Sequence, residues 1–158
     1  MEIIYTPWRY EYVSRVDQTE GCIFCDRIAQ DSDRENLVVH RGERCFAILN
    51  RYPYTSGHLM IAPYEHIGTI EDLDADTLVE MMALTQRFMK ALRQAYRPDG
   101  FNLGINIARV AGAGIKDHVH MHVVPRWAGD SNFMEVTAGT RVLPLTLDEV
   151  WVALSGNI

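Results

Sequence analysis

The chain has 158 residues, of which 47% are hydrophobic and 23% are charged, which is typical of a globular protein with one domain and its own core. Its net charge of −6 argues against non-specific binding to DNA or RNA, which requires a basic surface. No apolar stretch reaches the length of a membrane span, the N-terminal residues lack the form of a signal peptide, and three cysteines are too few for a disulfide framework. We therefore expect a cytoplasmic protein that binds neither nucleic acid nor a membrane.

The first part of the chain predicts a short helix followed by three strands. Residues 1–20 carry several aromatic side chains without clear periodicity, and we treat them as an N-terminal extension. A short helix is expected over 22–29. Alternation of apolar and polar residues predicts a hairpin with its turn at 41–43, and a third, apolar strand ends at Pro63. The three expected strands are 37–40, 45–49 and 58–62.

The longest predicted element is a helix from about Asp74 to Tyr96. Asp74 or Asp76 can cap its start, and Pro98 with Gly100 stops it. Apolar residues at helical spacing fall largely on one face, which predicts that this face is buried against the rest of the domain. These residues are Leu78, Met81, Met82, Phe88, Met89, Leu92 and Tyr96.

The second part of the chain predicts two more strands and a final helix. The strands are expected over 101–108 and 118–125, and a glycine-containing loop joins them. A C-terminal tail over 128–158 contains a loop-rich part and then a short helix over 145–154. One main helix packed on an antiparallel sheet is an α+β fold, and no linker divides the chain into more than one domain.

The run His118-Val119-His120-Met121-His122 is the most informative feature of the sequence. Side chains alternate across a strand, so the three imidazoles should project from one face while the apolar residues between them point into a core. Such a face can be purely structural, it can bind a metal, or it can carry nucleophilic catalysis at phosphorus. We favour the third, because neutral imidazole, with an unperturbed pKa of about 6.5, is a good nucleophile near neutral pH.

Other cysteines and histidines are open to simpler interpretations. Cys22 and Cys25 have the spacing of half a zinc site or of a redox pair, but the thioredoxin-like context of a redox pair is absent, and two reduced, half-buried thiols remain an alternative. Cys45 is expected to be a small core residue. His40 is expected to be solvated beside a turn, and His58 to make a structural hydrogen bond.

Several segments resemble the histidine triad family of nucleotide hydrolases and transferases, and the resemblance extends through almost the whole chain. The signature of that family is three histidines that alternate with apolar residues, as they do from His118 onwards. The ending Pro125-Arg126-Trp127, followed by Gly129-Asp130-Ser131-Asn132-Phe133, looks most like the branch of diadenosine tetraphosphate phosphorylases and their relatives. The resemblance also rests on segments 22–25, 49–54, 56–63 and 111–114.

The resemblance implies a role for each histidine of the triad. His120 corresponds to the family nucleophile, which attacks the α-phosphorus of a nucleotide and forms a nucleotidyl-histidine. His122 would contact the phosphate, and His118 would orient the site or bind a metal. The resemblance also implies a closed, structural zinc site made of Cys22, Cys25, His66 and His118.

The resemblance further implies where the nucleotide lies. Asn50 would contact the nucleoside, and Asn106 would be close to the phosphates. The loop residues Gly112, Ala113 and Gly114 would present backbone amides to the phosphate chain, because glycine lets a backbone approach closely. Some phosphorylase relatives carry a serine where this chain has Gly114, so a hydroxyl that could hold an acceptor phosphate is missing.

Two residues after the triad have two interpretations each. Arg126 can neutralise a phosphate or form a surface ion pair, and Trp127 can shape the nucleotide end of the site or pack in the core. Mg²⁺ would be expected on the substrate phosphates rather than in a site of its own.

The expected function is the cleavage of a dinucleoside polyphosphate, such as diadenosine tetraphosphate, with phosphate or water as acceptor. The alternatives are a nucleoside phosphoramidate hydrolase of the same family and a nucleotide-binding module without turnover. The resemblance also implies a homodimer.

Overall fold

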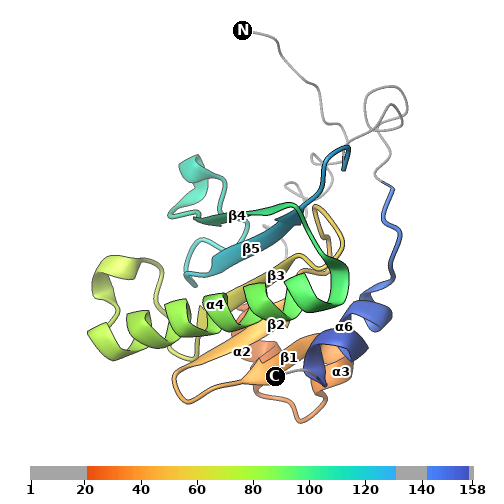
Figure 1. Cartoon of the computed structure of the whole chain (residues 1–158). Coiled ribbons are helices and arrows are strands. Elements are labelled where there is room, and N and C mark those ends of the chain that lie inside the picture. Colours follow the sequence, from red (N-terminus) through yellow and green to blue (C-terminus); the bar gives the residue numbers. More distant parts are fainter. Residues whose placement is uncertain (1–20, 131–141, 157–158) are drawn as a thin grey trace, which may run out of the picture.

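The computed structural model describes residues 21–130 and 142–156 (Figure 1). Within them, a five-stranded antiparallel sheet lies at the centre and helices pack around it, which confirms the predicted α+β fold. The expected extension over 1–20 and the run Ser131-Asn132-Phe133 lie outside the described residues. The strands are β1 (Val38–Arg41), β2 (Cys45–Leu49), β3 (Leu59–Pro63), β4 (Gly100–Ile105) and β5 (Met121–Arg126).

The strand order β1-β2-β3-β5-β4 places the histidine-containing strand inside the sheet. β1, β2 and β3 follow one another as antiparallel neighbours, so the predicted hairpin is confirmed. β5 then enters between β3 and β4, where His122 pairs with Met60 on one side and with Gly104 on the other. Strands on both sides therefore hold the backbone of this histidine in place.

β4 and β5 are shorter than the sequence predicts. β4 ends at Ile105 rather than at Ala108, because Ala108 has a φ of 63°, which lies outside the extended region. β5 begins at Met121, so His118 and His120 precede the paired part of the strand.

Helix α4 (Ala75–Tyr96) covers one face of the sheet, as Figure 1 shows. The Asp74 side chain caps its first turn, and Arg97 ends it with a left-handed φ of 49°. The predicted helix is confirmed, but Met82 was wrongly placed on its buried face and is 46% exposed. Met82 lies about 100° further round the helix than the buried Met81, which takes it off the sheet-facing side. α4 buries Thr77, Met81, Leu84, Thr85, Phe88, Ala91 and Leu92.

Helix α2 (Ile23–Ile28), predicted from the sequence, lies on the opposite face of the sheet from α4 (Figure 1). The Cys45 Sγ lies 3.6 Å from the Thr77 carbonyl oxygen of α4, whereas the next residue, Phe46, packs against Phe24 of α2 with ring centroids 6.1 Å apart. Successive side chains of a strand point to opposite faces, so the two helices cover different sides. Cys45 is fully buried, as predicted, and burial raises the pKa of its thiol to about 12.

Two more helices pack beside β1. The sequence did not predict α3 (Asp33–Asn36), whereas α6 (Leu147–Ser155) confirms the final helix and begins at a capping box made by Thr146 and Glu149. Val150 and Leu154 of α6 join the main core, so this part of the tail belongs to the domain. Short 3-10 turns occur at η2 (Ile70–Asp72) and η3 (Arg109–Ala111). No helix among the described residues is long and apolar enough to cross a bilayer.

Candidate functional site

The three histidines of the triad lie on the face of the sheet that α2 covers. The Phe24 ring centroid is 5.1 Å from that of His118 and 5.0 Å from that of His120, and the His122 ring is 4.8 Å from the His120 ring. The intervening Val119 is buried in the main core. These positions confirm that the three imidazoles share one face, although only His122 belongs to β5.

The ring of His120 is held in one tautomer. Its Nδ1 lies 2.8 Å from the carbonyl oxygen of His118, and because a carbonyl only accepts, Nδ1 carries the proton. Burial lowers the pKa of His120 below its usual value, so the ring is neutral at pH 7. The Nε2 atom of His120 therefore keeps a free lone pair, as a nucleophile requires.

His58, outside the triad, determines the tautomer of His122. The backbone N–H of Tyr54 donates to Nδ1 of His58 at 3.1 Å, so His58 carries its proton on Nε2. That Nε2–H donates to Nδ1 of His122 at 2.9 Å, which leaves Nε2–H of His122 as a donor for a ligand. The sequence predicted a structural hydrogen bond for His58, and the structure identifies its partner as the third triad histidine.

The half-buried state of His122 should make the stability of the protein depend on pH. Burial, with a smaller effect of the His120 charge, lowers the pKa of His122 to about 4 from the usual 6.5. Below about pH 6.5 the unfolded chain binds a proton here that the folded protein does not, so the free energy of unfolding should fall as the pH is lowered towards 4. Urea denaturation at several pH values should show a flatter fall for His122→Gln than for the wild type. Equal slopes for the two proteins would contradict this assignment.

The histidine face is open beside His122. Gly104 stands directly opposite His122 across the β4–β5 pair, and residues opposite each other point to the same face. A Cβ atom placed on Gly104 would meet no atom within 4 Å, so there is room for a ligand next to the His122 ring. Asn106 lies one position beyond the last pair of β4 and β5, level with His120.

The loop between Asn106 and the triad is tightly turned. Gly112 has a φ of 91°, and Ala108, with a φ of 63° and a ψ of 165°, adopts a conformation that side chains other than glycine rarely take. The Gly112 amide donates to Arg109, and the Ala113 amide to Ala108. Of the three amides expected to face the phosphates, only that of Gly114 has no backbone acceptor in the described part of the chain.

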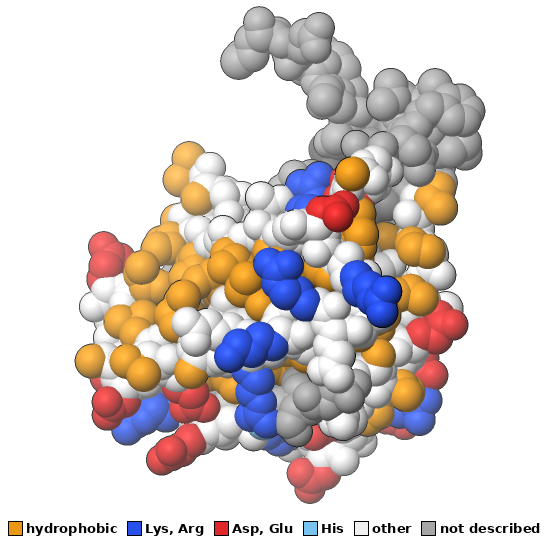
Figure 2. All heavy atoms as spheres, in the orientation of Figure 1, with side chains coloured by type: hydrophobic (Ala, Val, Ile, Leu, Met, Phe, Trp, Pro, Cys, Tyr) orange, Lys and Arg blue, Asp and Glu red, His pale blue; other side chains and the backbone are white. Residues whose placement is uncertain are grey.

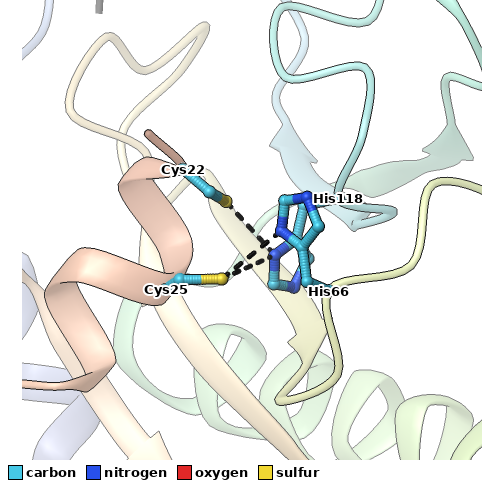
Figure 3. A group of neighbouring side chains, drawn as sticks. All are labelled: Cys22, Cys25, His66 and His118. Atoms are coloured by element: carbon cyan, nitrogen blue, oxygen red, sulfur yellow. Dashed lines mark hydrogen bonds between the residues drawn. The ribbon is translucent and has the colours of Figure 1, made fainter. Parts of the chain in front are cut away.

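The structure brings the two cysteines together with two histidines (Figure 3). The Cys22 Sγ lies 3.3 Å from Nδ1 of His118, and the Cys25 Sγ lies 3.6 Å from the same atom and 3.4 Å from Nδ1 of His66. The four ligand atoms all lie within 4.8 Å of one another. The carbonyl of Pro63 accepts from Nε2–H of His118 at 2.8 Å, which turns the lone pair of Nδ1 towards the cysteines.

These distances fit a metal of tetrahedral geometry. Zinc binds sulfur at about 2.3 Å and imidazole nitrogen at about 2.0 Å, so neighbouring S and N ligands of one ion are about 3.5 Å apart. Four protein ligands leave no open position, so a metal here would be structural. It would connect α2, the segment after β3 and the start of the triad. The position of His118 in this cluster supports its predicted metal role. Its carbonyl oxygen accepts the hydrogen bond that orients the His120 ring.

The other residues that the sequence analysis singled out make contacts with the protein itself. Asn50 accepts a hydrogen bond from the Tyr52 amide at 2.9 Å. Arg126 forms the surface ion pair that the sequence left open, with Asp130, and its Nη1 donates to Asn102. The indole N–H of Trp127 donates to the Tyr96 carbonyl at 3.3 Å, so a hydrogen bond holds this ring at the end of α4. His40 is half-buried rather than solvated, because its ring packs near Phe88 of α4.

Comparisons with known proteins agree with this geometry. The sequence pattern of the HIT domain matches residues 32–129. An AP-4-A phosphorylase of Mycobacterium tuberculosis is 39% identical over 154 residues, which cover 93% of this chain and 79% of that protein.

Solved structures match as well. A Zn-bound histidine triad family protein from Mycobacterium smegmatis superposes with a TM-score of 0.70 and 29% identity, covering 87% of this chain and 92% of that one. A hypothetical histidine triad nucleotide-binding protein from Sulfolobus tokodaii gives a TM-score of 0.68 and 28% identity, covering 86% and 91% of the two chains.

Proposed function

Because this chain belongs to the HIT domain family, we propose that it is an enzyme that cleaves dinucleoside polyphosphates such as diadenosine tetraphosphate through a nucleotidyl intermediate on His120. The observation that carries the proposal is the pair of opposite tautomers in the site. His120 offers a lone pair on Nε2, while His122 offers a proton on Nε2, and the two rings are 4.8 Å apart. The 39% identity with an AP-4-A phosphorylase supports the substrate class.

The chemistry follows from these two nitrogens. Nε2 of His120 attacks the α-phosphorus, the bond from phosphorus to the bridging oxygen breaks, and the rest of the polyphosphate leaves with that oxygen. Nε2–H of His122 donates a hydrogen bond to the phosphate and stabilises the charge that develops on its oxygens. Water or inorganic phosphate then attacks the same phosphorus, and the bond to His120 breaks, which restores the free imidazole.

Two acceptors, water and inorganic phosphate, are compatible with the described site. Gly114 supplies a backbone amide but no hydroxyl to hold an acceptor phosphate, so both water and phosphate fit the described site. Mg²⁺ would enter with the substrate phosphates, whose oxygens it prefers. The Cys22, Cys25, His66 and His118 cluster would hold a structural zinc ion and take no part in the bond changes.

A homodimer completes the proposal. β4 has a strand neighbour on only one side among the described residues, and hydrophobic side chains gather over α4 and the neighbouring strands in Figure 2. Val79, Met82 and Leu103, on α4 and β4, are all more than 40% exposed. An open strand edge next to apolar surface favours pairing with a second copy. A solution mass equal to one chain of 18.0 kDa would contradict the dimer.

Product analysis tests the function. Diadenosine tetraphosphate is incubated with the enzyme, with and without inorganic phosphate, and the nucleotides are separated by chromatography. ADP plus ATP formed only with phosphate would identify a phosphorylase, whereas AMP plus ATP without phosphate would identify a hydrolase. Absence of cleavage would overturn the substrate class. Turnover of adenosine 5′-phosphoramidate would then identify a phosphoramidate hydrolase, and nucleotide binding without turnover would identify a binding module.

A further inference from the structure

The loop between β2 and β3 places an aromatic side chain beside His122. The two ends of the loop are joined by the Asn50 amide, which donates to the His58 carbonyl at 3.0 Å. The hydroxyl of Thr55 donates to the Pro125 carbonyl at 2.7 Å, which attaches the loop to β5. Tyr54 directly precedes Thr55, so its position relative to the histidine strand is fixed.

The ring of Tyr54 lies against both imidazoles of the His58 and His122 pair. Its centroid is 4.6 Å from that of His58 and 6.2 Å from that of His122, and it is nearly parallel to the His122 ring, with an interplanar angle of 22°. These separations are those of aromatic rings in contact. In the described part of the chain, the rings that contact His122 belong to Tyr54, His58 and His120. Tyr54 is therefore a direct neighbour of the imidazole that is expected to donate to the phosphate.

Tyr54 contacts this pair through its backbone and through its side chain. The backbone N–H donates to Nδ1 of His58 and fixes the tautomer of that ring. The side chain packs beside the next hydrogen bond, from Nε2 of His58 to Nδ1 of His122. His58 is 1% exposed and Tyr54 is 41% exposed, so the tyrosine reaches from the buried imidazole to the solvent.

Water at this hydrogen bond would weaken the control of the His122 tautomer. A hydrogen bond that solvent can reach contributes less to stability, because water offers the same groups alternative partners. If Nδ1 of His122 exchanged its hydrogen bond for a proton, the neutral ring would carry its lone pair on Nε2. That atom could then no longer donate to a phosphate oxygen.

We propose that Tyr54 is a positioning residue whose ring shields the hydrogen bond from His58 to His122, and thereby keeps the proton of His122 on Nε2, where the phosphate needs a donor. This inference rests on the proposed function and adds to it a residue outside the triad. The ring provides the shielding, and the phenol hydroxyl is not required for it. Phenylalanine should therefore replace tyrosine at this position without loss.

The first test follows the His122 ring and needs no turnover. Long-range ¹H–¹⁵N correlation spectra near neutral pH distinguish protonated from unprotonated ring nitrogens, and the His122→Gln variant identifies the signals of His122. We expect a protonated Nε2 and an unprotonated Nδ1 in the wild type and in Tyr54→Phe. In Tyr54→Ala, both nitrogens should show averaged shifts. The pH midpoint of the His122 titration should also rise by at least about one unit, because loss of burial raises the pKa of an imidazole.

Two further variants complete this measurement. Tyr54→Gln keeps much of the side-chain volume but brings a polar group to the pair. It should therefore change the His122 signals in the same direction, even if the alanine variant fails to fold. Tyr52→Ala is the matched control, because it removes an equal ring from the same loop at a residue that is 64% exposed. This variant should leave the tautomer of His122 as it is in the wild type.

The second test separates positioning from substrate contact. His122 would donate to the phosphate under attack, which diadenosine tetraphosphate and adenosine 5′-phosphoramidate have in common. Tyr54→Ala should therefore lower kcat by about tenfold or more, with KM within about twofold, for each of the two that the enzyme cleaves. Tyr54→Phe should keep kcat within about twofold of the wild type. A rise in KM alone, with unchanged His122 signals, would show that Tyr54 contacts the nucleotide and would overturn the positioning role.

Failure of this inference and failure of the proposed function give different results. The same His122 tautomer and titration midpoint in the wild type, Tyr54→Ala and Tyr54→Gln overturn the inference, whatever the enzyme cleaves. Changed His122 signals together with an unchanged kcat also overturn it. Changed signals in a protein that cleaves neither substrate would support the shielding and reject the proposed function.

Discussion

Replacement of His120 by alanine is expected to lower kcat for diadenosine tetraphosphate by several powers of ten while the fold is retained. Nδ1 of His120 donates a hydrogen bond to the His118 carbonyl, which leaves Nε2 with the lone pair that the proposed attack on phosphorus needs. Initial rates, with circular dichroism spectra and thermal melts of both proteins, measure the effect.

His40→Ala is the matched control for this prediction. His40 is half-buried in β1, and its ring packs near Phe88 of α4, on the side of the sheet away from α2. Its loss should leave kcat close to that of the wild type. Normal turnover by the His120→Ala variant would show that the nucleophile is another group. Trapping of a nucleotidyl adduct on the wild type, detected by mass spectrometry of acid-quenched enzyme, provides an independent measurement.

Replacement of both Cys22 and Cys25 by serine is expected to remove bound zinc and to destabilise the protein. An ion that binds only the folded chain adds about 4 kcal/mol to the free energy of unfolding when free zinc is a thousand times its Kd. The loss should also lower kcat, because His118, a member of the cluster, supplies the carbonyl that orients His120. Elemental analysis gives the zinc content, and urea denaturation with and without a chelator gives the stability.

Cys45→Ala is the control for the metal prediction. Cys45 is fully buried in β2 and hydrogen-bonds to Thr77, so its loss can lower stability through packing, but zinc should remain at one ion per chain. If the wild-type protein contains no metal and a chelator changes neither its stability nor that of the double serine variant, the cluster is a set of hydrogen-bonded thiols and imidazoles.

Much of the fold could be predicted because its signals are local. The hairpin of β1 and β2 follows from alternation over a few residues, and α4 follows from apolar spacing between Asp74 and Pro98. The face shared by the three histidines follows from the two-residue repeat of an extended chain. The errors arise where the burial of a residue depends on the element packed against it. Met82 is exposed because the sheet covers only part of the helix.

In the candidate site, too, the sequence predicts the local patterns but not the orientations that depend on distant residues. The triad and the pair Cys22 and Cys25 are visible as short patterns, and the resemblance to the histidine triad family assigned His66 and His118 to that pair. The spacing in the sequence does not show that Nδ1 of His118 faces the sulfurs. That orientation depends on the Pro63 carbonyl, 55 positions away, which binds the other ring nitrogen.

The sequence by itself determined the α+β class and the alternation that places the three histidines on one face, because periodicity and residue type are properties of neighbouring positions. Only the tertiary structure decided the tautomers of His120 and His122 and the partners of His118 in the cluster with Cys22 and Cys25. These properties depend on hydrogen-bond partners and burial from segments far apart in the chain, which come together only when β5 enters between β3 and β4 and α2 covers the histidine face.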